Sequence, residues 1–192
     1  MGSAKAIMAV ADIMQNMNGP RASVVSATSG TTDKLIELGE QALKAGHWEE
    51  VFNEVVDKHN KIIEELEVEV DLHHIWDEIK KLAQGINLMR ELSISARDRL
   101  IGFGERISIH LLTAVLAKRG VKAKALDAYD FIFTDNNFSE GNVDFEKTNK
   151  AIVEKVQPLL EEGVIPVITG FVGQAENGHY ITLGRGGSDY TG

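Results

Sequence analysis

The stretch VIPVIT at Val164–Thr169 decides the fold class of this 192-residue chain. It is almost entirely apolar, which is typical of a strand that is buried on both faces of a sheet. A helical pattern over residues 145–162 precedes it, with Pro158 expected to kink or shorten that helix. Pro166 is the one conflict, because proline lacks the backbone N–H that a central strand donates. We nevertheless predict a strand here.

A helix followed by a short strand also occurs earlier in the chain. An apolar stripe over Ala96–Arg119 predicts a helix that Gly120 closes, and residues 121–126 are the strand expected after it. Two such units favour an α/β fold with a mainly parallel sheet. Short runs at residues 21–26 and 131–134 are predicted to be further strands.

The middle of the chain is predicted to be a mostly helical excursion from that sheet. Residues 4–17 carry apolar side chains at helical spacing, and His47–Arg90 is helical and highly charged. Asp71 is the expected N-cap of a second helix within the charged segment. Because no repeat or second domain is visible, we treat residues 1–192 as one domain.

Composition excludes several classes of function. The net charge of −9 argues against nucleic acid or an anionic membrane as the main partner. The chain has no cysteine, so disulfides, thiolate catalysis and cysteine metal sites are excluded. We find no signal peptide and no apolar run near the length of a membrane span. A soluble cytoplasmic protein is the expectation.

The histidines do not suggest a metal site. His73 and His74 are adjacent, so on a helix they point in different directions and do not chelate one ion easily. His47 and His59 are isolated in the sequence. We therefore predict that these histidines lie on the surface or pack in the core, and that the protein has no metal ligands of its own.

Two segments are candidates for binding chemistry. Residues 27–33 are small and hydroxyl-rich between a predicted strand and a predicted helix, an arrangement that can bind an anion or simply connect the two elements. Glu105 follows Gly102 and Gly104, whose presence in a helix suggests that something approaches the backbone closely. Glu105 itself could bind a ligand or lie at the solvent edge.

The C-terminal stretch is the third candidate. Gly184, Gly186 and Gly187 surround Arg185, so backbone N–H groups can crowd around an anion while the guanidinium binds a carboxylate or phosphate. Asp189 adds a carboxylate that could orient a lysine or hold a metal ion. A glycine-rich hairpin with a surface arginine is the alternative from composition alone.

These segments together resemble the aspartate kinases of the amino-acid kinase family. The most specific matches are LGRGGSD at residues 183–189 and FGERIS at residues 103–108. Weaker matches occur in the same order along the chain: VVSATSGTTDKL (24–35), TDNNF (134–138), EEGVIPVITGF (161–171), TGFVG (169–173) and GHYIT (178–182). The resemblance implies a three-layer amino-acid kinase fold.

The resemblance also implies an activity. Such an enzyme phosphorylates the side-chain carboxylate of L-aspartate from ATP, used as its Mg²⁺ complex, in the first step of lysine, threonine and methionine biosynthesis. A carboxylate nucleophile is already ionised at neutral pH, so the lack of a convincing general base agrees with this reading. Phosphoryl transfer then depends mostly on positioning and charge neutralisation.

Roles for individual residues follow from the resemblance. Arg185 would bind the α-carboxylate of aspartate and Glu105 its α-ammonium group. Ser26, Thr32 and Ser188 would line the substrate pocket. Asp189 would organise the charges around the transferred phosphoryl group. The glycines that would let substrate and phosphate approach the backbone are Gly30, Gly184, Gly186 and Gly187.

The chain departs from the family pattern at both ends. Aspartate kinases open with a strand and a KFGGTS-type loop whose lysine helps to hold ATP, and here Met1-Gly2-Ser3 stands where that motif would end. They continue past LGRGGSD with further nucleotide-binding and regulatory parts, and here the chain ends at Thr191-Gly192. We therefore expect a partial aspartate-binding domain without regulatory domains, inactive alone and homo-oligomeric in the full-length protein.

Three readings compete. The chain is part of an active aspartate kinase or of another amino-acid kinase; it is a non-catalytic amino-acid-binding fragment; or it is a helical interaction protein built on residues 47–90. Aspartate binding separates the first two from the third, and ATP turnover separates the first from the second.

Overall fold

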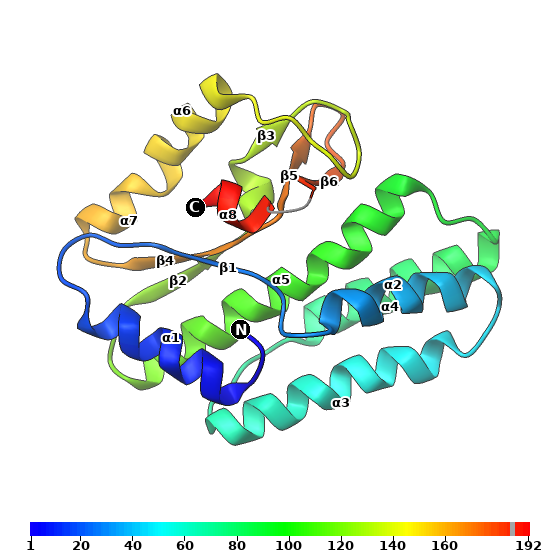
Figure 1. Ribbon diagram of the computed structural model, residues 1–192, viewed down its shortest axis with the longest axis horizontal. Coiled ribbons are helices and arrows are strands. Elements are labelled where there is room, and N and C mark those ends of the chain that lie inside the picture. The colour runs from blue at the N-terminus through cyan, green and yellow to red at the C-terminus, as the bar shows by residue number, and fades with distance from the viewer. Residues whose placement is uncertain (185–186) are drawn as a thin grey trace.

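The computed structural model describes residues 1–184 and 187–192 (Figure 1). The chain forms two small sheets, and helices pack against each of them. In chain order the elements are α1 (Ala4–Asn16), β1 (Ser23–Val25), α2 (Thr31–Leu43), α3 (Trp48–Leu66), α4 (His73–Met89), α5 (Ile94–Lys118), β2 (Ala123–Leu126), η1 (Ala128–Asp130), β3 (Phe133–Thr134), α6 (Phe145–Lys155), α7 (Gln157–Glu161), β4 (Ile165–Thr169), β5 (Val172–Ala175), β6 (Tyr180–Thr182) and α8 (Gly187–Thr191).

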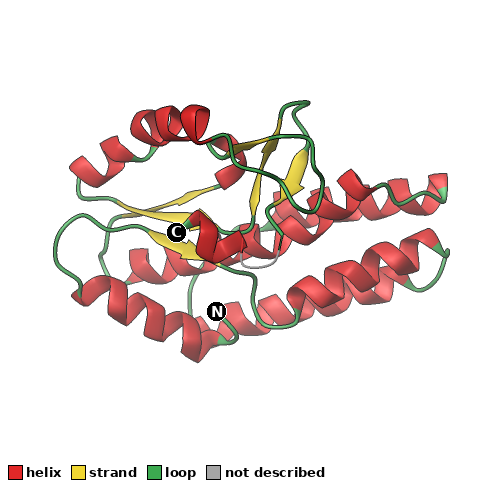
Figure 2. Cartoon of the chain, turned by 45° about the horizontal axis from the view of Figure 1, so that its top comes forward, coloured by secondary structure: helices red, strands yellow, loops and turns green. Residues whose placement is uncertain are grey.

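The main sheet has the strand order β1-β4-β2, and both pairings are parallel. Every residue of β4 is buried, because helices cover both faces of the sheet. Val25 and Val167 point into a core with α1, α2 and α5, whereas Ile168 points into a second core with residues of α6 and the α6–α7 junction. Figures 1 and 2 show the sheet between these two helical layers. The predicted three-layer α/β fold is confirmed.

Pro166 lies in the central strand, and the ladder explains why this is tolerated. Successive residues of a strand between two parallel neighbours direct their N–H groups to opposite sides. Ile165 donates toward the start of β2, and Gly170 donates to the last residue of β1. This alternation turns the nitrogen of Pro166 toward β1 at a level where β1 has not begun, since the pairing starts with Ser23 opposite Val167. The missing donor therefore costs no ladder bond.

The second sheet was not predicted in full. Its order is β3-β5-β6, with β3 parallel to β5 and β5 antiparallel to β6. The short pattern at residues 131–134 indicated only β3. β5 and β6 form a hairpin of short strands that contains a glycine, so neither has the length or alternation that predicts a strand. β6 is formed by the last part of the GHYIT motif.

The helical excursion comprises α2, α3 and α4, which pack against one another, and α2 and α4 also pack against α5. By length and composition alone α5 is apolar enough to cross a membrane, so the expectation that no such run exists is wrong. Only Glu105 and Arg106 carry charge between residues 100 and 117. In the fold 72% of the most apolar window is buried, as in the core helix of a globular protein.

Two helix boundaries differ from the sequence expectation in instructive ways. The predicted helix over 145–162 is divided into α6 and α7, because Pro158 lies in the first turn of α7 and cannot continue the helix before it. Asp71 is not the N-cap of α4; that residue is Leu72, whose side chain is buried. Asp71 instead accepts a hydrogen bond from the backbone N–H of His73 at 3.0 Å.

Candidate functional site

The β1–α2 loop, Ser26–Gly30, leads from the end of β1 to the first turn of α2. Gly30 is the N-cap of α2, has φ of +74° and makes no side-chain capping bond. This left-handed conformation favours glycine, which explains the glycine within a hydroxyl-rich stretch. Within residues 1–184 and 187–192, the backbone N–H groups of Thr32 and Asp33 donate no hydrogen bond. The start of α2 thus keeps free donors for an anion.

Glu105 faces this loop from α5. Its side chain is buried, and Oε1 accepts a hydrogen bond from the backbone N–H of Ala27 at 3.1 Å. Oε2 is also buried but has no donor in the described part of the chain. Burial raises the pKa of the Glu105 carboxyl to about 7, and the bond from Ala27 only partly opposes this shift. An orphaned buried carboxylate oxygen requires a partner, and a cationic ligand group supplies one.

Gly104 allows this close packing. A Cβ on Gly104 would lie 2.7 Å from the Cβ of Ala27, nearer than carbon atoms approach one another. The sequence expectation that glycine in FGERIS marks a close approach to the backbone is therefore confirmed. Any larger residue would push α5 away from the β1–α2 loop.

The neighbouring Arg106 does not neutralise Glu105. Its guanidinium bonds Glu78 at 2.9 Å through Nη1 and approaches Asp127 at 3.2 Å through Nε. Asp127 in turn accepts a hydrogen bond from the hydroxyl of Tyr180 at 2.6 Å. This cluster ties α4, α5 and β6 together. The positive charge of Arg106 thus stabilises the fold through Glu78 and Asp127, and the Glu105 carboxylate remains available to bind a ligand.

Residues from the two ends of the chain meet at the same loop. The hydroxyl of Ser26 donates to the Oγ of Ser188 at 3.0 Å, across 162 positions of sequence. Ser26 and Ala27 are consecutive, so the loop contacts α8 through one residue and Glu105 through the next. Asp189 follows on α8 with an exposed side chain. The predicted site residues Ser26, Glu105 and Ser188 are therefore close together.

Three further predicted site residues lie at the start of α2, after β6 and at the start of α8. Thr32 is half-buried in the first turn of α2. Gly184 follows β6 and Gly187 begins α8. Arg185 and Gly186 lie outside the described residues, so their predicted roles stay predictions.

Sequence reasoning missed a polar cluster behind the loop. The hydroxyls of Thr28 and Thr31 contact each other at 2.6 Å, and Thr28 also contacts Nε2 of His59 at 2.9 Å. Lys58 donates to Thr31 Oγ1 at 2.8 Å and to the carbonyl of Ser29. One signal was available: His59 occupies the apolar stripe of α3 between Val55 and Ile62, where a polar side chain is unusual.

Asp98 is a second buried carboxylate on α5, and it was not predicted. Both of its oxygens accept hydrogen bonds, from the N–H and hydroxyl of Ser139 and from the N–H of Thr182, at 2.8, 3.0 and 3.0 Å. These bonds fasten the N-terminal part of α5 to β6 and to the segment after β3. Asp98 therefore has a structural role, and both of its carboxylate oxygens are hydrogen-bonded.

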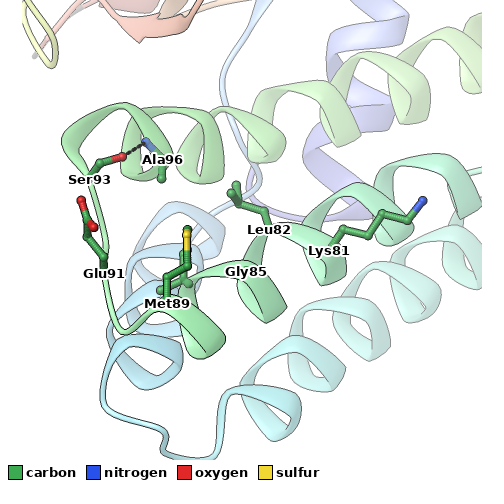
Figure 3. Close-up of a pocket in the computed structure, with 8 residues that line it drawn as sticks. Lys81, Leu82, Gly85, Met89, Glu91, Ser93 and Ala96 are labelled. Carbon is green, nitrogen blue, oxygen red and sulfur yellow. Dashed lines mark hydrogen bonds between the residues drawn. The ribbon is translucent and has the colours of Figure 1, made fainter.

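A separate pocket of about 260 Å³ lies between the end of α4 and the start of α5 (Figure 3). Its lining is mainly aliphatic, and the hydroxyl of Ser93 caps α5 by accepting from the N–H of Ala96 at 3.1 Å. None of the predicted site residues lines it. Among the described residues no group of three or more His, Asp or Glu side chains could hold a metal ion.

The chain is similar to proteins of known activity. It is 33% identical to aspartokinase 1, chloroplastic, of Arabidopsis thaliana, over all of this chain and 35% of that protein. It is 31% identical to lysine-sensitive aspartokinase 3 of Escherichia coli, over 94% of this chain and 40% of that protein. The chain therefore spans about 35–40% of the length of these relatives.

Solved structures give the same picture. Escherichia coli aspartokinase III in complex with aspartate and ADP superposes with a TM-score of 0.89 at 28% identity, over 99% of this chain and 42% of that chain. The complex of the same enzyme with lysine and aspartate gives a TM-score of 0.82. A family model described as the amino acid kinase family matches residues 1–192. The chain belongs to the amino acid kinase family.

Proposed function

We propose that this chain is the aspartate-binding part of an aspartate kinase. That enzyme transfers the γ-phosphoryl group of ATP to the side-chain carboxylate of L-aspartate. The observation that carries the proposal is the buried Glu105 carboxylate, which has one oxygen without a donor in the described part of the chain and lies beside the β1–α2 loop. The similarity to aspartokinases, one of them solved with aspartate and ADP, supports aspartate as the substrate.

Aspartate would be held by both of its backbone charges. Glu105 accepts hydrogen bonds from the α-ammonium group, which restores a partner to Oε2. Arg185 binds the α-carboxylate through its planar guanidinium, a role proposed from the LGRGGSD motif. Ser26, Thr32 and Ser188 line the pocket between these two charges. The contact of Ser26 with Ser188 supports a pocket shared by the loop and α8.

The reaction needs no general base in this scheme. The ionised side-chain carboxylate of aspartate attacks the γ-phosphorus, the bond to the bridging oxygen of ATP breaks, and ADP leaves with its electron pair. The free N–H groups at the start of α2 stabilise negative charge on the reacting side chain and phosphoryl group. Gly30, Gly184, Gly186 and Gly187 let these groups approach the backbone.

Asp189 completes the proposed site by orienting cationic groups around the transferred phosphoryl group. Mg²⁺ enters the site as part of the substrate, in its complex with ATP. From the sequence we also propose that the full-length protein is cytoplasmic and homo-oligomeric.

Binding to the 192-residue chain tests the proposed substrate. We expect L-aspartate to give saturable heat by isothermal titration calorimetry, while L-glutamate, one methylene longer, binds more weakly. Equal binding of the two amino acids would favour another amino-acid kinase. No binding of either would reject the assignment of this site.

Catalysis is tested in the full-length protein that carries this segment. Hydroxylamine traps an acyl phosphate as a hydroxamate, so it separates phosphorylation of a carboxylate from phosphorylation of a hydroxyl group. We expect hydroxamate that depends on L-aspartate and MgATP. ADP release without hydroxamate would contradict the proposed acceptor.

Arg185 has its own test in the same protein. Arg185→Lys should raise KM for aspartate nearly as much as Arg185→Ala, because an ammonium group does not replace a bidentate fork. If the lysine variant keeps the wild-type KM, the proposed role of Arg185 is wrong.

A further inference from the structure

The polar cluster behind the β1–α2 loop has no role in the reaction described above. Its four members come from the loop, from the first turn of α2 and from α3, which packs against α2 (Figure 1). Thr28, Thr31 and His59 are at most 1% exposed, so their polar atoms depend on one another for hydrogen bonds.

The donor and acceptor of each hydrogen bond in the cluster follow from the groups at the two ends of the series, His59 and Lys58. Nδ1 of His59 lies 2.7 Å from the carbonyl oxygen of Val55, which only accepts, so Nδ1 carries a proton. Burial lowers the pKa of His59 to about 4, so the ring is neutral and Nε2 is an acceptor. Thr28 lies 2.9 Å from Nε2 and Thr31 lies 3.5 Å from it, so the nearer hydroxyl of Thr28 donates to His59. Thr31 then donates to Thr28. Lys58 donates to Thr31 and completes the order.

This chain of bonds occupies the two hydroxyl groups that could otherwise cap α2. Threonine near a helix N-terminus commonly accepts from the free N–H groups of the first turn. Here Thr28 and Thr31 are turned inward to His59, the N-cap is Gly30 without a capping bond, and the donors of Thr32 and Asp33 stay free. The same loop holds Glu105 in place through the N–H of Ala27.

We propose that His59 is a positioning residue for the substrate site, which holds the β1–α2 loop through Thr28 and Thr31 so that the first N–H groups of α2 remain available to the ligand. His59 does not touch the substrate and takes no part in the transfer. The inference rests on the proposed function for the identity of the ligand, but the effect of His59 on the loop is independent of it.

The test compares three substitutions in the 192-residue chain. His59→Leu removes the acceptor, whereas His59→Gln keeps a side-chain oxygen that can accept from Thr28. Thr28→Val removes the hydroxyl that donates to His59 and accepts from Thr31, without changing the size of the side chain, so the proposal stays testable if His59→Leu does not fold. Ile62→Ala is the control, since it truncates a buried residue of the same apolar stripe of α3 that has no polar side-chain atom and takes no part in the hydrogen bonds of the cluster.

Two measurements are made on each variant: the exchange rate of the backbone amides of residues 27–33 without ligand, and the Kd for L-aspartate. We expect His59→Leu and Thr28→Val to speed loop exchange and to weaken aspartate binding about tenfold, the equivalent of one lost hydrogen bond. His59→Gln should stay close to wild type, and the double variant His59→Leu/Thr28→Val should be no worse than its worse single parent.

The proposal is overturned if His59→Leu leaves both loop exchange and Kd unchanged. It is also overturned if Ile62→Ala, at matched loss of stability, weakens aspartate binding equally. If the wild-type chain binds no aspartate, the proposed function fails, and loop exchange alone decides the role of His59.

Discussion

Helix α5 carries two buried carboxylates that differ in one respect. Asp98 accepts hydrogen bonds from Ser139 and Thr182 through both oxygens, whereas Glu105, seven positions later, accepts one bond from Ala27 and keeps a buried oxygen unpaired. Burial of a charge is costly unless its hydrogen-bonding capacity is used. Asp98, whose oxygens are both bonded, therefore stabilises the fold. Glu105 has a buried oxygen that can accept a hydrogen bond from a ligand.

The largest effect is expected at the satisfied carboxylate. Asp98→Ala leaves three donors without an acceptor and should lower the free energy of unfolding by about 3–5 kcal/mol. Urea denaturation of the ligand-free chain measures this loss. Glu146→Ala is the control, because it removes only an exposed ion pair with Lys150 and should cost less than about 1 kcal/mol. Similar losses for the two variants would show that Asp98 does not hold the scaffold.

The unsatisfied carboxylate should make stability depend on pH. The pKa of Glu105 is about 7 in the folded chain and 4.5 in its ordinary state, so the folded state binds the proton more tightly. Glu105 therefore stabilises the folded state fully below pH 4.5, and this stabilisation is lost as the pH rises through 7. The free energy of unfolding should fall by about 3 kcal/mol over this range. Glu105→Gln should remove this slope from the pH profile of urea unfolding. An unchanged slope in Glu105→Gln would contradict the assignment.

Binding should follow the same titration. The α-ammonium group of aspartate requires the charged form of Glu105, so binding at pH 6 should release a proton and the affinity should rise up to about pH 7. Calorimetry in buffers of different ionisation enthalpy measures the released proton. Binding without proton release at pH 6 would show that Glu105 is already charged in the free chain.

The glycines beside Glu105 provide a smaller and more local test. Gly104→Ala brings a methyl group to 2.7 Å from Ala27 and should cost about 1–3 kcal/mol through overpacking, partly offset by better helix propensity. Gly102→Ala is the control, because its methyl group meets Val172 Cγ1 at 3.0 Å and Tyr180 Cδ1 at 3.9 Å, on β5 and β6 and not on the β1–α2 loop. We expect Gly104→Ala alone to weaken aspartate binding. Equal effects on binding would argue against a special fit at Gly104.

Much of the fold could be predicted because its signals are local. The VIPVIT strand and its preceding helix, and the earlier helix–strand unit, follow from periodicity and from turn residues within a few positions. Glu105 could be singled out because its glycine neighbours are unusual in a helix. The β5–β6 hairpin could not, since each strand has at most four residues and their pattern is interrupted by glycine.

The satisfied polar groups could not be predicted because their partners are remote in sequence. The donors to Asp98 come from positions 41 and 84 residues away, and Thr28 is 31 residues from His59. A charged residue near the start of a helix, such as Asp98, ordinarily indicates an exposed position. Only the tertiary arrangement shows that it is buried and paired.

The most direct test of the account is the affinity of wild-type chain and Glu105→Gln for L-aspartate and for succinate at pH 8. Succinate lacks the amine, so it cannot use the free oxygen of Glu105. We predict that Glu105→Gln weakens aspartate binding by about 1.5–3 kcal/mol, the worth of a hydrogen bond to a charged group, and changes succinate binding much less. Equal losses for the two ligands would contradict the account, because Glu105 would then act only on the structure of the site.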